Sequence, residues 1–191
     1  LILRPINWET PAHILEKIIA YEAVHEINSW DELRLRLAPK DRRCFAFFHP
    51  AMQDEPIIFV EVALMKNIPS KIQNVLEEKR DFLEPDEANV AVFYSISNCQ
   101  KGLSGISFGN FLIKQVANDL QFEFNNIKKF VTLSPVPGLR NWIKNKKPKF
   151  EMILEKFKKS EQFLKVEPSL MNCAGNYFLN SDRSDGMPND P

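Results

Sequence analysis

The chain has 191 residues, 44% of them hydrophobic and 26% charged, and its 25 basic and 25 acidic side chains give a net charge of zero. This composition is typical of one globular domain with a proper core, and the balanced charge gives no support to a nucleic-acid or membrane role. No apolar run approaches the ~20 residues needed to span a bilayer. Three widely spaced cysteines favour a reducing compartment over a disulfide framework or a zinc site.

The first half of the chain predicts two helices followed by two strands. Residues 1–9 are interpreted as an irregular lead. A threonine–proline pair opens the helical pattern of 10–24, and a Ser-x-x-Glu capping box opens that of 29–37. Residues 42–49 and 57–65 are apolar for most of their length. This predicts two strands, buried on both faces and joined as an antiparallel hairpin by a longer loop.

A few polar residues of this half could be either structural or functional. Glu61 interrupts an apolar strand, and we interpret it as a core-edge residue with a partner rather than as part of a site. His13 and His25 lack metal-ligand spacing and are interpreted as surface or boundary residues. His49, at a strand end, is also interpreted as structural.

Shorter elements flank the centre of the chain. A helix is predicted to begin at Pro69-Ser70 with Ser70 as its cap, and the charged residues 77–89 indicate a solvated loop. Beyond the centre, apolar spacing predicts helical segments over 139–143, 153–164 and 169–179.

The stretch from 90 to 138 predicts a strand, a glycine-bearing loop, a helix and a second strand. The first strand covers 90–96, and the second covers 129–133 and ends at Ser134. The helix is predicted from apolar residues four apart and from three more on the same broad face: Phe108, Leu112, Val116, Leu120 and Phe124, then Phe111, Ile113 and Ala117.

Two interpretations of this loop remain open from the residues alone. The free N–H groups at a helix start attract phosphate, and glycines allow a ligand to approach the backbone closely. Alternatively, Gly102, Gly105 and Gly109 only shape the turn and let the helix pack on the sheet. Spacing favours the second interpretation, because it matches neither the P-loop nor the dinucleotide fingerprint.

Long segments of the sequence resemble the catalytic domain of malonyl-CoA decarboxylase. The three most specific are FYSIS (93–97), QKGLSGISFGNFLIKQV (100–116) and TLSPVPGLRNW (132–142). Others follow in the family's order: INWETP (6–11), EAVHEINSWDELRLRL (22–37), RRCFAFFHP (42–50), EPIIFVEVAL (55–64), EPSLMNCAGNYFLN (167–180) and DGMPNDP (185–191). The resemblance implies a mixed α/β sheet flanked by helices, with the fold of the GCN5-related N-acetyltransferases, which agrees with the predicted mixture of strands and helices.

The resemblance also implies site residues. The family's malonyl-CoA-binding segment falls on Ser104, Gly105, Ile106, Ser107, Phe108, Gly109 and Asn110. Its catalytic serine, which also binds malonyl-CoA, falls on Ser134. The second catalytic residue of the family is a histidine in an F-H-L-x-N-G-A motif shortly after D-P-V-A. This chain stops at Asp190-Pro191, so that histidine is expected beyond Pro191, and none of the three histidines present matches its position.

The expected activity is that of a carboxy-lyase in fatty-acid and malonyl-CoA metabolism, which converts malonyl-CoA to acetyl-CoA and carbon dioxide. No metal or organic cofactor is expected, because the thioester carbonyl of the substrate accepts the charge as an enolate. Two alternatives stay open: an acyl-CoA N-acyltransferase of the same fold, and a non-catalytic acyl-CoA-binding relative.

The expected organisation is one catalytic domain over residues 1–191, truncated at both ends and without the family's N-terminal helical domain. The expected partners are malonyl-CoA and acetyl-CoA, with no nucleic acid or membrane. We expect the full-length protein to be a homo-oligomer, a dimer or a tetramer. Its expected location is cytoplasmic, or mitochondrial or peroxisomal in a eukaryote.

Overall fold

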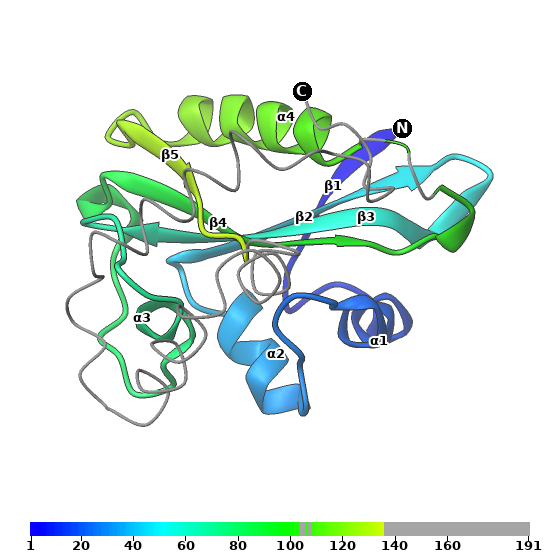
Figure 1. Cartoon of the computed structure of the whole chain (residues 1–191), viewed down its shortest axis with the longest axis horizontal. Helices are drawn as coiled ribbons and strands as arrows, with labels where there is room; N and C mark the ends of the chain where they lie inside the picture. Colours follow the sequence, from blue (N-terminus) through cyan, green and yellow to red (C-terminus); the bar gives the residue numbers. More distant parts are fainter. Residues whose placement is uncertain (104–105, 107, 136–191) are drawn as a thin grey trace, which may run out of the picture. The chain divides into compact units, whose positions relative to one another are not determined.

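A five-stranded sheet with its strands in sequence order carries the fold (Figure 1). The computed structural model describes residues 1–103, 106 and 108–135. Four strands are antiparallel neighbours and the fifth runs parallel to the fourth: β1 (Ile2–Ile6), β2 (Arg42–His49), β3 (Met52–Met65), β4 (Val90–Asn98) and β5 (Lys129–Thr132). The predicted mixed sheet is therefore confirmed.

Helices cover both faces of this sheet. On one face lies α4 (Phe108–Glu123), and on the other lie α1 (Ala12–Tyr21), α2 (Trp30–Leu37) and α3 (Gln73–Leu76) (Figure 1). Two short 3₁₀ helices, η1 (Pro85–Glu87) and η2 (Lys101–Leu103), stand in the connections. Within the described ranges no helix is both long and apolar enough to cross a bilayer.

The face of the sheet under α4 holds one hydrophobic core. Leu112, Val116 and Leu120 are completely buried, as their four-residue spacing predicts. They pack against strand residues that include Phe47, Ile58, Val60, Val62 and Phe93. Phe111 lies at the border of this face and is not buried: it is 58% exposed, and its ring stacks on that of the buried Phe47 with 5.6 Å between the centroids.

The opposite face is covered mainly by α1 and α2. Ile14, Leu15 and Ile18 of α1 are buried, as are Leu33 and Leu37 of α2. They pack on strand side chains that point to this face: Cys44, Ala46, Phe48 and Phe59. Because β2 and β3 are covered on both faces, their nearly continuous apolar sequences are explained.

The structure corrects the predicted start of the sheet. Residues 2–6 form a strand and not an irregular lead, because they pair along β2 from Ile2 opposite Phe48 to Ile6 opposite Cys44. The hairpin loop is also shorter than predicted. β3 begins at Met52, so Asp54-Glu55-Pro56 belong to the strand, and the register shifts next to Phe48 absorb the irregularity.

Two of the three predicted helix caps are wrong, although α1 does begin at Ala12, next to the predicted Thr10-Pro11 start. The Thr10 hydroxyl accepts a hydrogen bond from Asn7 N at 3.0 Å and does not cap α1. α3 begins at Gln73 without a side-chain cap, so Ser70 has no such role. The Ser29 cap is confirmed, because its hydroxyl accepts from Glu32 N at 3.1 Å.

The chain divides into two compact units, Leu1–Ser134 and Pro135–Pro191. Apart from Pro135, the second unit lies outside the described residues. The helical segments predicted for 139–143, 153–164 and 169–179 lie there too, so they stay predictions.

The buried stripe of α4 generates a stability prediction. We expect Leu120→Ala to lower the free energy of unfolding by about 2–5 kcal/mol, because it removes methyl groups from a closed core. Phe122→Ala is the control on the same helix: Phe122 is 88% exposed, and its truncation is expected to change stability by no more than about 0.5 kcal/mol. Urea unfolding curves measure both, and equal losses would contradict the assignment of the buried face.

Candidate functional site

The edge of β4 that faces β5 is the first feature of the candidate site. The two strands pair only from Val90 to Phe93. Their last backbone contact is the bond from Leu133 N to Phe93 O, at 2.8 Å. On the other side of β4 the register with β3 shifts by one residue at Tyr94, which forms a bulge. Beyond Phe93, β4 continues to Asn98 with no strand of the described ranges beside it on the β5 side.

Ser134 lies next to the point where this pairing stops. It directly follows Leu133, whose backbone is bonded to Phe93, and its side chain is exposed. The following residue, Pro135, restricts the backbone of both itself and Ser134. The predicted catalytic serine is therefore accessible and held at the carboxyl end of a parallel strand pair, the edge at which open α/β sheets bind ligands.

The predicted binding segment is only partly described. Ser104, Gly105 and Ser107 lie outside the described residues. Ile106 is 50% exposed and Asn110 is also exposed, while Phe108 and Gly109 are half-buried at the first turn of α4.

Two of the three glycines of this loop are described, Gly102 and Gly109, and neither is required by close packing. A Cβ at Gly109 would lie 3.7 Å from the Ile96 side chain and 4.0 Å from that of Ile58, which are ordinary contacts, and Gly102 has open space around it. Neither glycine adopts a positive φ that would exclude other residues. Gly109 therefore lies where the helix meets the sheet.

A polar cluster holds the segment after α1 against the same part of β4. The buried Glu22 carboxylate accepts hydrogen bonds from the hydroxyls of Ser95, at 2.7 Å, and Ser97, at 3.2 Å. Ser97 Oγ in turn accepts from the backbone N of Ala23 at 3.1 Å. These bonds tie the chain that leaves α1 to alternate residues of β4.

His25 belongs to this cluster. It is half-buried, as expected for a boundary residue, and its Nε2 lies 3.1 Å from Tyr94 O, where it can donate a hydrogen bond. Burial lowers the pKa of His25, an effect that the nearby Glu22 carboxylate opposes. The other two histidines are exposed: His13 lies 3.6 Å from Asp54, and His49 Nδ1 accepts from Ala51 N at the hairpin turn.

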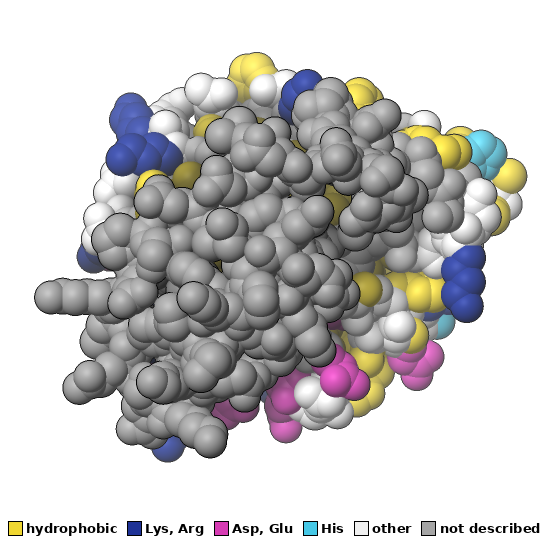
Figure 2. Space-filling model, in the orientation of Figure 1, with side chains coloured by type: hydrophobic (Ala, Val, Ile, Leu, Met, Phe, Trp, Pro, Cys, Tyr) yellow, Lys and Arg dark blue, Asp and Glu magenta, His cyan; other side chains and the backbone are white. Residues whose placement is uncertain are grey.

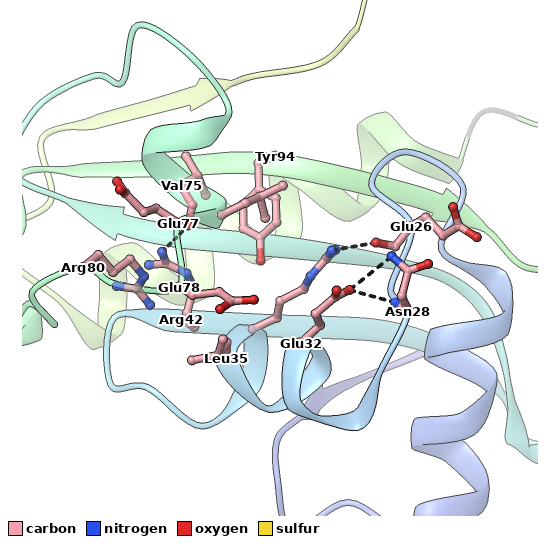
Figure 3. A pocket seen from close by; sticks show the side chains of 12 residues that line it. Glu26, Asn28, Glu32, Leu35, Arg42, Val75, Glu77, Glu78, Arg80 and Tyr94 are labelled. Atoms are coloured by element: carbon pink, nitrogen blue, oxygen red, sulfur yellow. Dashed lines mark hydrogen bonds between the residues drawn. The ribbon is translucent and has the colours of Figure 1, made fainter.

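A cavity of about 240 Å³ lies on the α2 side of β4 (Figure 3). Tyr94 extends from β4, and its hydroxyl points into this cavity (Figure 3). Glu32 and Leu35 of α2 line one side, and Glu77 and Glu78 after α3 line another. Figure 2 shows acidic side chains at the lower edge of the molecule, which is the side of α1 and α2 in Figure 1.

A buried ion pair lies beside this cavity. Arg36 Nη1 donates to Glu61 Oε2 at 3.1 Å, and the Glu61 side chain is completely buried. The interpretation of Glu61 as a residue with a partner is thus confirmed. Burial raises the pKa of Glu61 to about 7, with Arg36 opposing the shift. Glu61 Oε1 and the Tyr94 hydroxyl have no hydrogen-bond partner in the described part of the chain.

The other arginines of the cavity are engaged by the protein. Arg42 donates to Val75 O at 2.7 Å and to Asp41 O at 2.9 Å, and Arg80 forms a two-pronged pair with the Asp41 carboxylate. No sequence pattern marks Arg36, Arg42 or Tyr94 as site residues. The one sequence feature that indicated such a partner was the carboxylate of Glu61 in an apolar strand, because a buried charge requires a partner. Within the described ranges, no three His, Cys, Asp or Glu side chains gather as a metal site would require.

Comparisons with known proteins agree along the whole chain. A family model described as the malonyl-CoA decarboxylase C-terminal domain matches residues 1–191. The solved malonyl-CoA decarboxylase of Agrobacterium vitis is 57% identical, with 90% of this chain and 39% of that chain covered and a TM-score of 0.73. The structure from Rhodopseudomonas palustris is 47% identical, with 100% and 50% covered and a TM-score of 0.84.

A curated relative gives the same family name. The goose protein (Anser anser anser) named mitochondrial malonyl-CoA decarboxylase is 41% identical over 146 residues, which are 75% of this chain and 29% of the relative. The chain therefore spans less than a third of that relative and half or less of the two solved chains.

The buried carboxyl group generates a pH prediction. Folded Glu61 keeps its proton up to about pH 7, whereas an ordinary glutamate loses it near 4.5, so the folded state binds more protons between these values and stability falls as pH rises. Glu61→Gln does not titrate. We expect the stability of this variant relative to the wild type to increase by on the order of 1–3 kcal/mol between pH 4.5 and 7.

Denaturant unfolding at a series of pH values measures this difference. Glu123→Gln is the matched control, because its carboxylate pairs with Arg43 at 2.8 Å but is 47% exposed. A constant difference between Glu61→Gln and the wild type across this pH range would contradict the raised pKa of Glu61.

Proposed function

The chain belongs to the malonyl-CoA decarboxylase family, matched by its C-terminal domain, and we propose that it catalyses the conversion of malonyl-CoA to acetyl-CoA and carbon dioxide. The observation that carries the proposal is the match of the family model to all of residues 1–191. Because the chain spans only part of its relatives, the activity is proposed for the full-length protein.

The reaction requires control of charge and of one proton. The bond between the α-carbon and the carboxylate breaks, carbon dioxide leaves, and the electron pair moves into the thioester as an enolate. A proton then adds to the α-carbon to give acetyl-CoA. The site must orient the carboxylate out of the carbonyl plane, stabilise the enolate oxygen and supply the proton.

We assign the stabilisation of the enolate to Ser134. Its side chain is exposed, and its backbone is restrained by Pro135 and by the adjacent bond from Leu133 to Phe93. A hydroxyl held in place is a suitable donor to a developing oxyanion, because little reorganisation is needed when charge forms. The resemblance assigns the second catalytic role to a histidine beyond Pro191, and we propose that it delivers the proton.

We assign binding of the coenzyme A part to residues 104–110 and the start of α4. The exposed Ile106 and Asn110, at and just before the start of α4, support this assignment. Gly109 also allows α4 to begin close to the sheet. No metal or organic cofactor is proposed, because the thioester carbonyl itself accepts the electron pair.

The remaining expectations belong to the same proposal. We propose a homo-oligomer, with malonyl-CoA and acetyl-CoA as its small-molecule partners and no nucleic acid or membrane partner. The compartment is proposed to be the cytoplasm, or a mitochondrion or peroxisome in a eukaryote.

The direct test is to incubate the full-length protein with malonyl-CoA. We expect carbon dioxide and acetyl-CoA in equal amounts, because each cleaved bond yields one of each. Carbon dioxide release and mass spectrometry of the thioesters measure the two products. Transfer of an acyl group to an added amine would instead support an N-acyltransferase, and binding without turnover would support a non-catalytic acyl-CoA-binding protein.

The assignment of Ser134 predicts the effect of its removal. Ser134→Ala is expected to lower kcat by about 10²–10³-fold while the affinity for coenzyme A changes little, because the hydroxyl acts on the developing oxyanion. Steady-state kinetics and calorimetric titration with coenzyme A measure the two effects. Ser70→Ala, at an exposed serine outside the site, is the control, and a fully active Ser134→Ala variant would remove Ser134 from the mechanism.

A further inference from the structure

Glu55 of β3 receives side-chain hydrogen bonds from two other parts of the chain. Lys17 Nζ donates to Oε2 at 2.5 Å and the Tyr21 hydroxyl donates to Oε1 at 2.6 Å, both from α1. Gln100 Nε2 donates to Oε1 at 3.1 Å from the chain that follows β4. The carboxylate thereby joins a helix, a strand and the entrance of the glycine-bearing segment.

Gln100 is the residue at which the chain leaves the sheet. The last backbone hydrogen bond from the end of β4 to β3 is donated by Cys99 N to Ile57 O, at 2.9 Å. The Gln100 side chain extends this attachment by one residue, because its Nε2 also donates to Pro56 O at 3.1 Å. The 3₁₀ turn Lys101–Leu103 and the proposed coenzyme A segment follow directly.

The connection from Asn98 to Gly109, which contains the glycine-bearing segment, begins and ends over the same residues of the sheet. At its start, Asn98 is paired with Ile58. At its end, a Cβ on Gly109 would lie 4.0 Å from the Ile58 side chain and 3.7 Å from that of Ile96. The two described ends of this connection are thus both attached to the same part of the sheet.

The network around Glu55 is stronger than an isolated surface ion pair. Its side chain is 27% exposed, and the hydrogen bond from Lys17, followed by that from Tyr21, lowers the pKa of Glu55, so the carboxylate stays charged. The hydrogen bond between Tyr21 and Glu55 raises the pKa of Tyr21, so its hydroxyl remains a donor. By contrast, Lys40 and Glu84 form a pair whose side chains are 71% and 64% exposed, and such pairs contribute little.

We propose that Glu55 is a positioning residue for binding of the coenzyme A thioester, which it serves by holding Gln100 at the entrance of the glycine-bearing segment. This inference rests on the proposed function. Glu55 does not act on the reacting atoms, because the proposed catalytic serine follows β5. Its loss leaves the Gln100 side chain with one acceptor, Pro56 O, instead of two at the start of the segment, and this is expected to weaken ground-state and transition-state binding equally.

The test is a double-mutant cycle of Glu55→Gln and Gln100→Ala in the full-length protein, with malonyl-CoA as substrate and coenzyme A as binding probe. Glu55→Gln retains the size of the side chain but loses the charge that engages Lys17. Each single variant is expected to raise KM for malonyl-CoA and Kd for coenzyme A by about fivefold, with kcat within about twofold of wild type. The double variant is expected to bind no worse than the weaker-binding single variant, because both act on the same contact: Glu55→Gln weakens its acceptor and Gln100→Ala removes its donor.

Glu84→Gln is the matched control, because it removes a carboxylate that accepts from Lys40 at 3.0 Å far outside the segment, and its KM and Kd are expected to equal those of wild type. Additive effects in the double variant would overturn the proposal. A lower thermal midpoint with unchanged KM and Kd would also overturn it, since Glu55 would then serve stability alone. If wild-type protein neither binds nor cleaves malonyl-CoA, the proposed function fails and this inference fails with it.

Discussion

The end of backbone pairing between β4 and β5 is the constraint on which the candidate site depends. β5 pairs with four residues of β4 and no more, and the bulge at Tyr94 changes the course of β4 just beyond that point. A strand that loses one neighbour leaves peptide groups that need other partners. Ser134 follows the last paired residue, and α4 begins after the chain has left the far end of β4. The early end of β5 therefore leaves β4 beyond Phe93 without β5 beside it, and it places Ser134 next to that edge.

The Arg36–Glu61 pair lies on the other side of β4, and we expect it to contribute to specificity of packing rather than to net stability. Burying both charges costs free energy that their contact only partly recovers, and Glu61 keeps one oxygen without a partner in the described part of the chain. The register of β3 places Glu61 opposite Ser95, beside the bulge. Moving β3 by one residue would turn this carboxylate toward the apolar core under α4. The pair therefore disfavours alternative registers in the strand that supports the bulge.

Local sequence patterns predicted the elements that fill the core, whereas strand β1 and the Arg36–Glu61 pair depend on contacts between distant parts of the chain. The stripe of Leu112, Val116 and Leu120 follows directly from helical spacing, because one face must meet the sheet. β1 was missed since Arg4 and Pro5 interrupt its apolar pattern, yet Arg4 lies over the Phe48 ring and donates to Gln53 O. Arg36 and Glu61 are 25 residues apart, and no local rule pairs them. The binding segment and Ser134 came from the family resemblance, because their spacing alone matches no general motif.

Helix α1 links the apolar core to the part of β4 that lies beyond its pairing with β5. Its buried residues Ile14, Leu15 and Ile18 fix the helix on the sheet, while Lys17 and Tyr21 project to Glu55 and thus to Gln100. The next residue, Glu22, accepts from Ser95 and Ser97. Carboxylate contacts thus restrain β4 beyond its pairing with β5, at Ser95 and Ser97, and the chain just after β4, at Gln100. The proposed decarboxylation relies on groups that are already in place when charge develops. The stability of α1 packing is therefore expected to affect catalysis through the position of β4, although α1 lies more than a hundred residues before Ser134 in the sequence.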